Sequence, residues 1–290
     1  MSFQLNKLGY LFFLCFTQAS CQSHGKLTLV ADIPSSLEEN SGIQFYSENS
    51  IWVIEDNGNK DKIYQLDQTG NITKELKVKN AKNDDWEDLA KDIHGNLYIG
   101  DFGNNGNDKK KLRIYKLPNP QKEKGDKIDA EKIEFFYPEQ KHYPPKETKL
   151  YYDTEAFFHW KNSLYLITKN RTRPYDGKAL IYKVPDTKGK YKAKLVGEFI
   201  ICSNQNTCSI TSADISSDGK KIALLSYGYL TILTDFNFDD FSKGKKQQID
   251  LGVRTQLEAV SFKNDSTLLL SDEKSHTQGG NLYSLNLSKL

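Results

Sequence analysis

The chain repeats one short pattern, first as Ser41-Gly42-Ile43 followed by the apolar strand Ile51–Ile54. In each copy a small or acidic residue precedes an apolar strand by nine or ten positions. The other four copies begin at Glu87-Asp88-Leu89, Glu155-Ala156-Phe157, Ser212-Ala213-Asp214 and Glu258-Ala259-Val260. The strands that follow them are Leu97–Ile99, Leu164–Ile167, Ile222–Leu225 and Leu268–Leu270. A repeat of this length predicts one supersecondary unit that is copied around a ring.

Most copies contain four predicted strands in roughly fifty residues, which is typical of a β-propeller blade. The third strand recurs as an apolar residue followed by Tyr, at Ile63-Tyr64, Ile114-Tyr115, Ile181-Tyr182 and Leu282-Tyr283. Successive copies start 46, 68, 57 and 46 residues apart, and the longest interval holds the charged insertion Pro118–Pro145 with one further strand. The sequence therefore predicts an all-β, five-bladed β-propeller. Six blades, a β-sandwich or an irregular β domain are the alternatives.

The fifth copy lacks its outer strand, because the chain ends at Leu290. The segment Lys26–Ala31, with its alternating apolar residues, could supply that strand from the other end of the chain. This pairing gives a closing interval of 48 residues, close to the other intervals. We therefore expect the N-terminal strand to complete the last blade, which would leave no exposed edge between the first and last blades.

The first residues differ in character from the rest of the chain. Lys7 precedes the apolar run Leu8–Phe16, and Ala19-Ser20-Cys21 follows it. This pattern predicts a secretory signal peptide over residues 1–20, a short tether over 21–25 and a single propeller domain over 26–290. The small residues before Cys21 resemble a bacterial lipoprotein cleavage site, although Gln18 stands where an aliphatic residue is usual. We expect an exported protein, either secreted or a cell-envelope lipoprotein with lipid on Cys21; an uncleaved signal anchor is the alternative.

The charge balance and the remaining cysteines limit the function further. The formal net charge is +2, which argues against nucleic-acid binding because that function needs a basic patch. Contact with a membrane is expected only through the lipid anchor. Cys202 and Cys208 flank a short loop and are predicted to form a disulfide in an oxidising compartment. The alternative, a redox or metal-binding pair, would need a companion His or Cys, which the neighbouring sequence lacks.

The recurring small and acidic residues predict a metal site. In a propeller the first strand of each blade lines the central channel, so residues in one register would face the axis at one height. Three carboxylates in a confined site repel each other and raise one another's pKa values, and a hard cation relieves this repulsion. Oxygen ligands favour Ca²⁺ over zinc. The predicted Ca²⁺ ligands are Ser41, Glu87, Glu155, Ser212 and Glu258. Alternatively, the three Glu side chains bond to backbone amides or to water.

The order Ser, Glu, Glu, Ser, Glu on five inner strands resembles the calcium-activated nucleotidase (apyrase) family, which are secreted or lumenal five-bladed propellers with one Ca²⁺ in the tunnel. The general layout also resembles phytase-like propellers. The resemblance implies that the recurring residues hold Ca²⁺ or its waters. It further implies that Asp56 orients a water while Arg171 and Arg173 clamp phosphate oxygens. The chain departs from the family at Asn57 and Gly58, where the family has an Arg.

Acidic and amide residues follow several second strands and would lie at the same mouth of the channel. The candidate ligand-binding residues at this rim are Asp101, Asn104, Asn105, Asp272 and Glu273. Such a rim suits a cation or a polar neutral ligand better than a polyphosphate, although capping of strand-end turns also explains Asp101 and Asp272. We expect a surface protein that binds a small polar or phosphorylated ligand or another surface protein. The alternatives are a calcium-dependent phosphohydrolase that acts on nucleotides or other phosphate esters, and a lactonase-like propeller.

Overall fold

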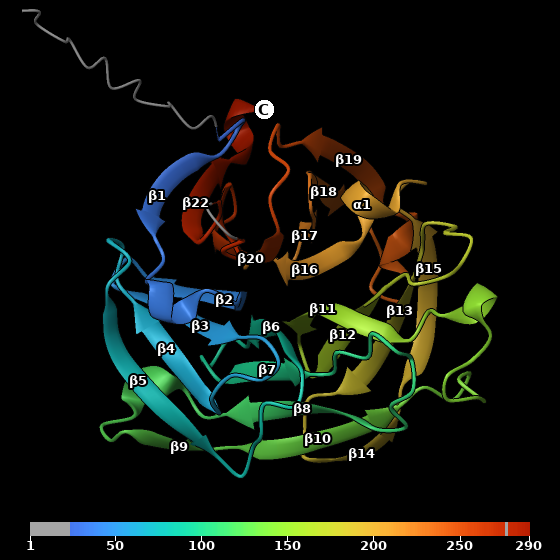
Figure 1. Ribbon diagram of the computed structural model, residues 1–290, viewed down its shortest axis with the longest axis horizontal. Coiled ribbons are helices and arrows are strands. Elements are labelled where there is room, and N and C mark those ends of the chain that lie inside the picture. Colours follow the sequence, from blue (N-terminus) through green and yellow to red (C-terminus); the bar gives the residue numbers. More distant parts are fainter. Residues whose placement is uncertain (1–23, 276–277) are drawn as a thin grey trace, which may run out of the picture.

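Five β-sheets surround one central axis in the computed structural model, which describes residues 24–275 and 278–290 (Figure 1). The prediction of a five-bladed β-propeller is confirmed. The predicted signal peptide and the predicted lipid site Cys21 lie outside the described residues. Within the residues that are described, no helix has the length and apolar character needed to cross a membrane.

Each blade has four antiparallel strands. Blade 1 contains β2 (Asn40–Ser47), β3 (Ser50–Glu55), β4 (Lys62–Leu66) and β5 (Ile72–Lys79). Blade 2 contains β6 (Trp86–Lys91), β7 (Leu97–Asp101), β8 (Leu112–Leu117) and β10 (Glu131–Phe136). Blade 3 contains β11 (Asp153–Trp160), β12 (Ser163–Lys169), β13 (Lys178–Pro185) and β15 (Lys194–Ile200). Blade 4 contains β16 (Ile210–Ile215), β17 (Ile222–Ser226), β18 (Tyr229–Thr234) and β19 (Lys245–Asp250).

Blade 5 joins the two ends of the chain. It contains β20 (Leu257–Asn264), β21 (Thr267–Asp272), β22 (Asn281–Asn286) and, as its outer strand, β1 (Thr28–Asp32). β1 is antiparallel to β22, with Thr28 opposite Ser284 and Asp32 opposite Asn281. The predicted closure of the ring by the N-terminal strand is therefore confirmed.

Two short parallel strands, which the sequence did not predict, extend the first two blades. β9 (Lys127–Asp129) lies in the charged insertion and pairs with β5 of blade 1. β14 (Gly189–Lys192) lies in the chain segment of blade 3 and pairs with β10 of blade 2. Each strand thus covers the edge of the preceding blade. The helices among the described residues are α1 (Gln205–Cys208) and the 3₁₀ turns Ser35–Leu37, Pro120–Lys122, Glu147–Lys149, Phe241–Lys243 and Leu287–Lys289.

The hydrophobic core is divided among the contacts between blades. Each of five clusters of buried apolar residues joins two neighbouring blades, including blades 1 and 5. Trp86 belongs to the cluster between blades 1 and 2, and Phe157 to the one between blades 2 and 3. Since burial of apolar area is the main favourable term in folding, each blade depends on both of its neighbours.

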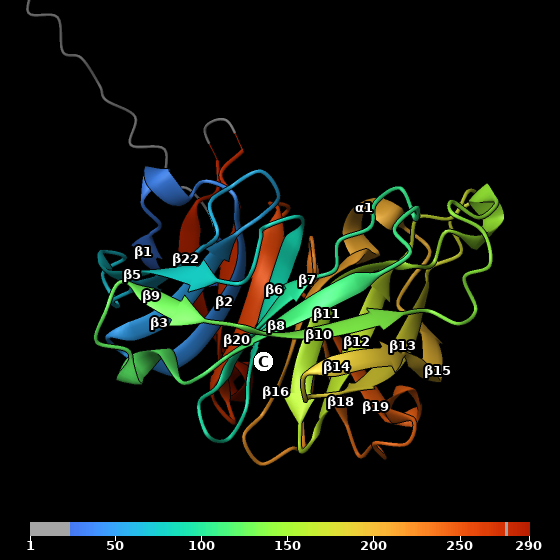
Figure 2. The same cartoon turned by 90° about the horizontal axis from the view of Figure 1, so that it is seen from below.

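The inner strands β2, β6, β11, β16 and β20 run between the two faces of the ring (Figure 2). Each of them has a β-bulge near its start, where its register with the second strand shifts by one residue. The extra residues at these bulges are Ser41, Glu87, Glu155, Thr211 and Glu258. A bulge re-aims a side chain, and here it does so at the same level in every blade.

The position predicted in blade 4 was wrong by one residue, because Thr211 and not Ser212 occupies the bulge. Ser212 lies one position further along β16 and is fully buried, and its hydroxyl donates to Asp88 Oδ1 at 2.9 Å. Ser212 does not occupy the bulge position, and its hydroxyl is engaged by Asp88 and by the amide of Val260, which removes it from the predicted ligand set.

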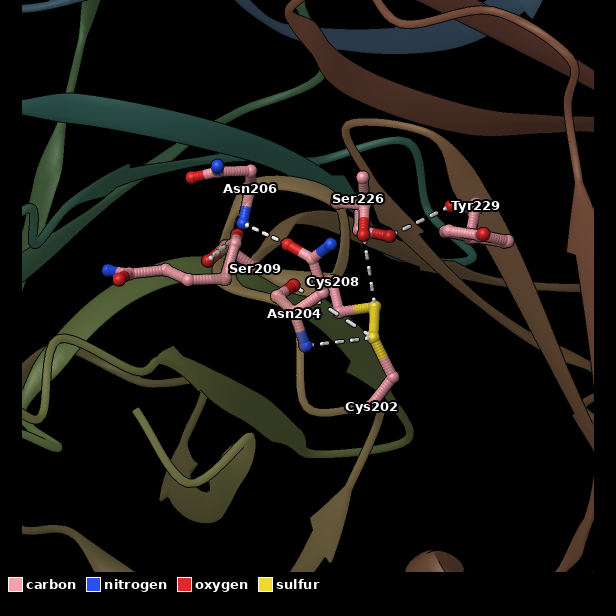
Figure 3. The surroundings of a disulfide bond; sticks show 9 residues. Cys202, Asn204, Asn206, Cys208, Ser209, Ser226 and Tyr229 are labelled. Carbon is pink, nitrogen blue, oxygen red and sulfur yellow. Dashed lines mark hydrogen bonds between the residues drawn. A yellow bond between two sulfur atoms is a disulfide. The ribbon is translucent and has the colours of Figure 1, made fainter. Parts of the chain in front are cut away.

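Cys202 and Cys208 form the predicted disulfide in the structure. Cys202 and Cys208 lie 5.8 Å apart between their Cα atoms, and the bond closes the loop that carries α1 (Figure 3). Asn204 caps α1 by accepting a hydrogen bond from the amide of Asn206 at 3.0 Å. The disulfide thus holds the entry to β16 in blade 4.

Candidate functional site

A polar cavity of about 230 Å³ lies on the channel axis at the level of the bulges. Four of the five predicted metal ligands line it, namely Ser41, Glu87, Glu155 and Glu258. Four residues predicted at the rim or as catalytic groups also line it, namely Asp56, Asn105, Arg171 and Glu273. The bulges therefore collect side chains from the inner strands, and the loops after the second strands of several blades complete the wall.

Three further lining residues were not predicted to take part in the site: Lys169, Tyr227 and Gln256. Lys169 is the last residue of β12, and its ammonium lies 3.1 Å from Glu155 Oε2 and 3.2 Å from the hydroxyl of Tyr227. Although burial lowers the pKa of Lys169, Glu155 and Glu258 raise it above its usual value. A permanent positive charge thus lies beside Glu155 and Glu258, on the side of the channel formed by blades 3 to 5.

Arg171 adds a second positive charge on the same side. Its Nε lies 2.6 Å from Asp153 Oδ2 and its Nη2 lies 2.9 Å from Glu155 Oε1. Its guanidinium also donates to Asn105 Oδ1. Glu155 is therefore paired with both Lys169 and Arg171. Arg173, predicted to act with Arg171, is exposed and does not line the cavity.

The carboxylates on the side of blades 1 and 2 form fewer salt bridges with basic side chains. One oxygen from each of Asp56, Asp85 and Glu87 lies within 4.8 Å of the others. Lys109 pairs with Asp85 at 2.6 Å, but no salt bridge among the described residues involves Glu87. Burial, followed by the charges of Glu155 and Asp56, raises the pKa of Glu87 well above its usual value. Asp56 and Glu87 line the cavity, and Asp85 lies directly beside it.

The backbone of Gly103 lies very close to the carboxylates of this cluster. Gly103, in the turn after β7, packs directly against the carboxylates of Glu87 and Asp85, where a Cβ would collide with both. Its carbonyl oxygen accepts a hydrogen bond from Lys109 Nζ at 2.6 Å. Only a residue without a side chain leaves room for the two carboxylates at this point.

Three of the predicted rim residues have structural roles instead. Asp101 accepts hydrogen bonds from the amides of Asp84 and Asp85, and Asp272 accepts from the amide of Asn281 and the hydroxyl of Tyr283. Asn104 donates to the carbonyl of Tyr152. These side chains are buried and fix turns at the ends of the second strands. Asn105 and Glu273 are the two predicted rim residues that line the cavity.

Comparisons with known proteins establish the fold alone. No family model matches the sequence, and no curated protein matches it either. One similar solved structure is the PQQ-bound aldose sugar dehydrogenase from Streptomyces coelicolor, with 10% identity, a TM-score of 0.54, and coverage of 90% of this chain and 98% of that one. Another is a glucose dehydrogenase, with 7% identity, a TM-score of 0.51, and coverage of 90% and 99%.

A gluconolactonase from Xanthomonas campestris has 12% identity, a TM-score of 0.44, and coverage of 85% and 71%. At 10% and 7% identity, the two dehydrogenase structures show a shared fold and do not carry over an activity. None of these three proteins is a nucleotidase, and the resemblance to that family remains a prediction.

Proposed function

We propose that this chain is an exported β-propeller that binds Ca²⁺ between Asp56, Asp85 and Glu87, and receives a small oxygen-rich ligand at the adjoining mouth. The observation that carries the proposal is the cluster of three carboxylates within 4.8 Å, in which Glu87 is buried and lacks a salt bridge among the described residues. A hard divalent cation with oxygen ligands relieves this repulsion.

The charge of the whole cavity supports the proposal. Five acidic side chains and two basic ones line it. Lys169 and Arg171 both pair with Glu155, whereas Asp56 and Glu87 in blades 1 and 2 form no salt bridge among the described residues. The proposed ion therefore sits off the axis, on the side away from Lys169, and shares only Glu87 with the ligand set predicted from the sequence. A cavity of about 230 Å³ leaves room for an ion, its waters and a small ligand group.

Hydrolysis of a phosphate ester is the second candidate function. Asp56 and Arg171 line one cavity, as the nucleotidase resemblance implies. The exposed Arg173 lies outside it, however, and Arg171 is already engaged by Asp153 and Glu155. We therefore favour binding over catalysis. Phosphate release that requires Ca²⁺ and is lost in Asp56→Asn would reverse this preference.

Calcium is expected to raise the melting temperature of the wild-type protein, and Glu87→Gln is expected to abolish this increase. Ca²⁺ at one hundred times its dissociation constant adds about 2.7 kcal/mol to the free energy of unfolding, or a shift of roughly 5 °C or more. The measurement is thermal unfolding with Ca²⁺ or with chelator. Glu198→Gln is the matched control, because it removes an exposed carboxylate on β15 that does not line the cavity. This variant should keep the full calcium-dependent increase in melting temperature.

The calcium shift should grow between pH 5 and pH 8. Burial raises the pKa values of the proposed ligands Glu87 and Asp56 above their usual values, and burial followed by the charge of Asp56 raises the pKa of the neighbouring Glu273 to about 7. In the absence of a cation, the folded state binds protons that the unfolded state has already lost, so stability falls as pH rises through this range. Cation binding offsets that loss. Equal melting temperatures with Ca²⁺ and with chelator at pH 8 would refute the proposed site.

Export and lipidation form a separate part of the proposal, which rests on Leu8–Phe16 and Ala19-Ser20-Cys21. Mass spectrometry of the protein from a bacterial envelope is expected to find a mature N-terminus at Cys21 that carries acyl chains. Cys21→Ser should yield an unacylated protein. An intact N-terminus at Met1 in the wild-type protein would contradict cleavage.

A further inference from the structure

A second cavity, of about 790 Å³, opens at the other end of the channel. The carboxylate cavity is lined near the starts of the inner strands, whereas this cavity is lined at the ends of all five of them. In β2, for example, Ser41 lines the first cavity and Gln44 lines the second. With a rise of about 3.3 Å per strand residue, the two residues are about 10 Å apart along the strand.

An unpartnered amide oxygen lies in the wall of this cavity. Gln44 is 3% exposed, and its Nε2 donates to the hydroxyl of Ser261 at 3.0 Å. Its Oε1 is buried and has no hydrogen-bond partner. Leaving a buried acceptor unsatisfied costs about 1–3 kcal/mol. A ligand that carries a hydrogen-bond donor would remove this cost, and a purely apolar ligand would not.

A lysine provides the complementary donor. Lys91, at the end of β6, donates one hydrogen bond to the carbonyl of Phe45 at 2.6 Å. Its ammonium also lies 4.8 Å from the centre of the Tyr46 ring. Because an ammonium has three N–H donors, Lys91 can still donate to a ligand. Gln44 and Lys91 thus offer one acceptor and one donor from neighbouring inner strands.

Much of the remaining wall is apolar or aromatic, including Phe45, Tyr46, Trp160 and Phe262. Ile93, in the turn after β6, also lines the cavity and is 90% exposed. Aromatic faces bind the apolar face of a ring while polar groups fix its orientation.

The charges at this mouth nearly cancel. Four lysines and three aspartates line the cavity. The aspartates are already engaged within the protein: Asp186 lies 2.9 Å from His159 Nε2, Asp214 accepts the amide of Phe262 at 2.7 Å, and Asp92 accepts turn amides. This balance favours a neutral polar ligand over an ion.

We propose that the second cavity binds a carbohydrate, with one hydroxyl donating to Gln44 Oε1, another accepting from Lys91 Nζ, and a ring face against the aromatic wall. A hydroxyl group both donates and accepts hydrogen bonds, and a sugar ring combines several of them with an apolar face. The site uses no residue of the carboxylate cavity, so it is independent of the proposed calcium site.

Tryptophan fluorescence tests the proposal with the full-length protein. Of the three tryptophans, Trp52 and Trp86 are fully buried and Trp160 lines the cavity. Glucose, galactose, xylose and cellobiose serve as probes. At least one is expected to change the emission saturably at millimolar concentration, and Trp160→Phe should remove the change. Chelator should leave binding intact. The absence of saturable binding for all four sugars, or loss of binding on chelation, would overturn the proposal.

Calorimetric titration of variants assigns the contacts. Gln44→Leu and Lys91→Met, which keep much of the side-chain volume, are each expected to weaken binding about tenfold or more. Lys188→Met, an exposed position outside the cavity, is the control and should bind as the wild type does. Circular dichroism shows whether each variant is folded. If Gln44→Leu does not fold, the affinity of Lys91→Met alone decides the assignment. Wild-type affinity in Lys91→Met would overturn the assignment.

Discussion

Replacing Asp88 with alanine is expected to lower the free energy of unfolding by about 3–5 kcal/mol. The side chain is fully buried at the centre of the ring, and it joins three blades. Oδ1 accepts from the amide of Leu89 at 2.9 Å in its own blade and from the hydroxyl of Ser212 at 2.9 Å in blade 4. Oδ2 accepts from the amides of Phe157 in blade 3 and Ala213 in blade 4, both at 3.2 Å.

The large effect follows from what the substitution leaves behind. Alanine would leave the amides of Leu89, Phe157 and Ala213 and the hydroxyl of Ser212 without an acceptor in the buried interior. Each buried donor without a hydrogen-bond partner lowers the free energy of unfolding. Asp67→Ala is the matched control, because Asp67 also accepts amide hydrogen bonds, at 2.8 Å and 3.0 Å, but in an exposed turn of blade 1. We expect that control to cost less than about 1 kcal/mol. Urea unfolding measures both, and similar midpoints for the two variants would show that Asp88 does not join the blades.

The same contact explains where sequence-based prediction failed in blade 4. Thr211 and Ser212 are adjacent, small and hydroxylated, so the pattern alone gives no reason to prefer one for the bulge. The structure places Ser212 against Asp88 and directs the hydroxyl of Thr211 to the carbonyl of Leu257 at 2.7 Å. Long-range hydrogen bonds thus set a register that local sequence leaves open.

The blades themselves were predictable because their signal is periodic. Apolar strands, turn residues and the apolar–Tyr pair recur at similar intervals, and closure follows from counting residues. β9 and β14 carry no such signal: they are short, largely exposed, and parallel to strands from the preceding blade. Their pairing depends on where the surrounding loops lie in space.

The sequence predicted most of the acidic residues of the candidate site, but it predicted less well the basic residues that neutralise them. Glu87, Glu155 and Glu258 follow from the repeat, because bulged residues of neighbouring blades point to one axis. Asp85 precedes its strand, and Lys169 ends a second strand, so neither belongs to the repeated position. The place of Lys169 at the end of a second strand predicts that it lies at the same mouth as Asp56, but it does not show which carboxylate its long side chain reaches.

Deleting the residues up to Ile33 is expected to prevent the ring from closing and to yield little or no folded monomer. The deletion removes β1, exposes the edge of β22, and removes Leu27 from the cluster between blades 4 and 5. An unpaired strand edge promotes pairing with other chains, so we expect aggregation. Circular dichroism and size-exclusion chromatography measure the outcome.

A circular permutant separates the loss of β1 from the loss of its position in the chain. Thr28, at the start of β1, pairs with Ser284 near the end of β22, and Lys26 and Leu290 line one groove. Residues 24–33 attached after Leu290 through a short flexible linker can therefore return as a hairpin and restore the same antiparallel pairing. Because ring closure then forms within one continuous blade, the permutant should fold as a monomer and melt close to the wild type. A truncated protein with wild-type melting, or a permutant that aggregates equally, would show that β1 does not hold the ring closed.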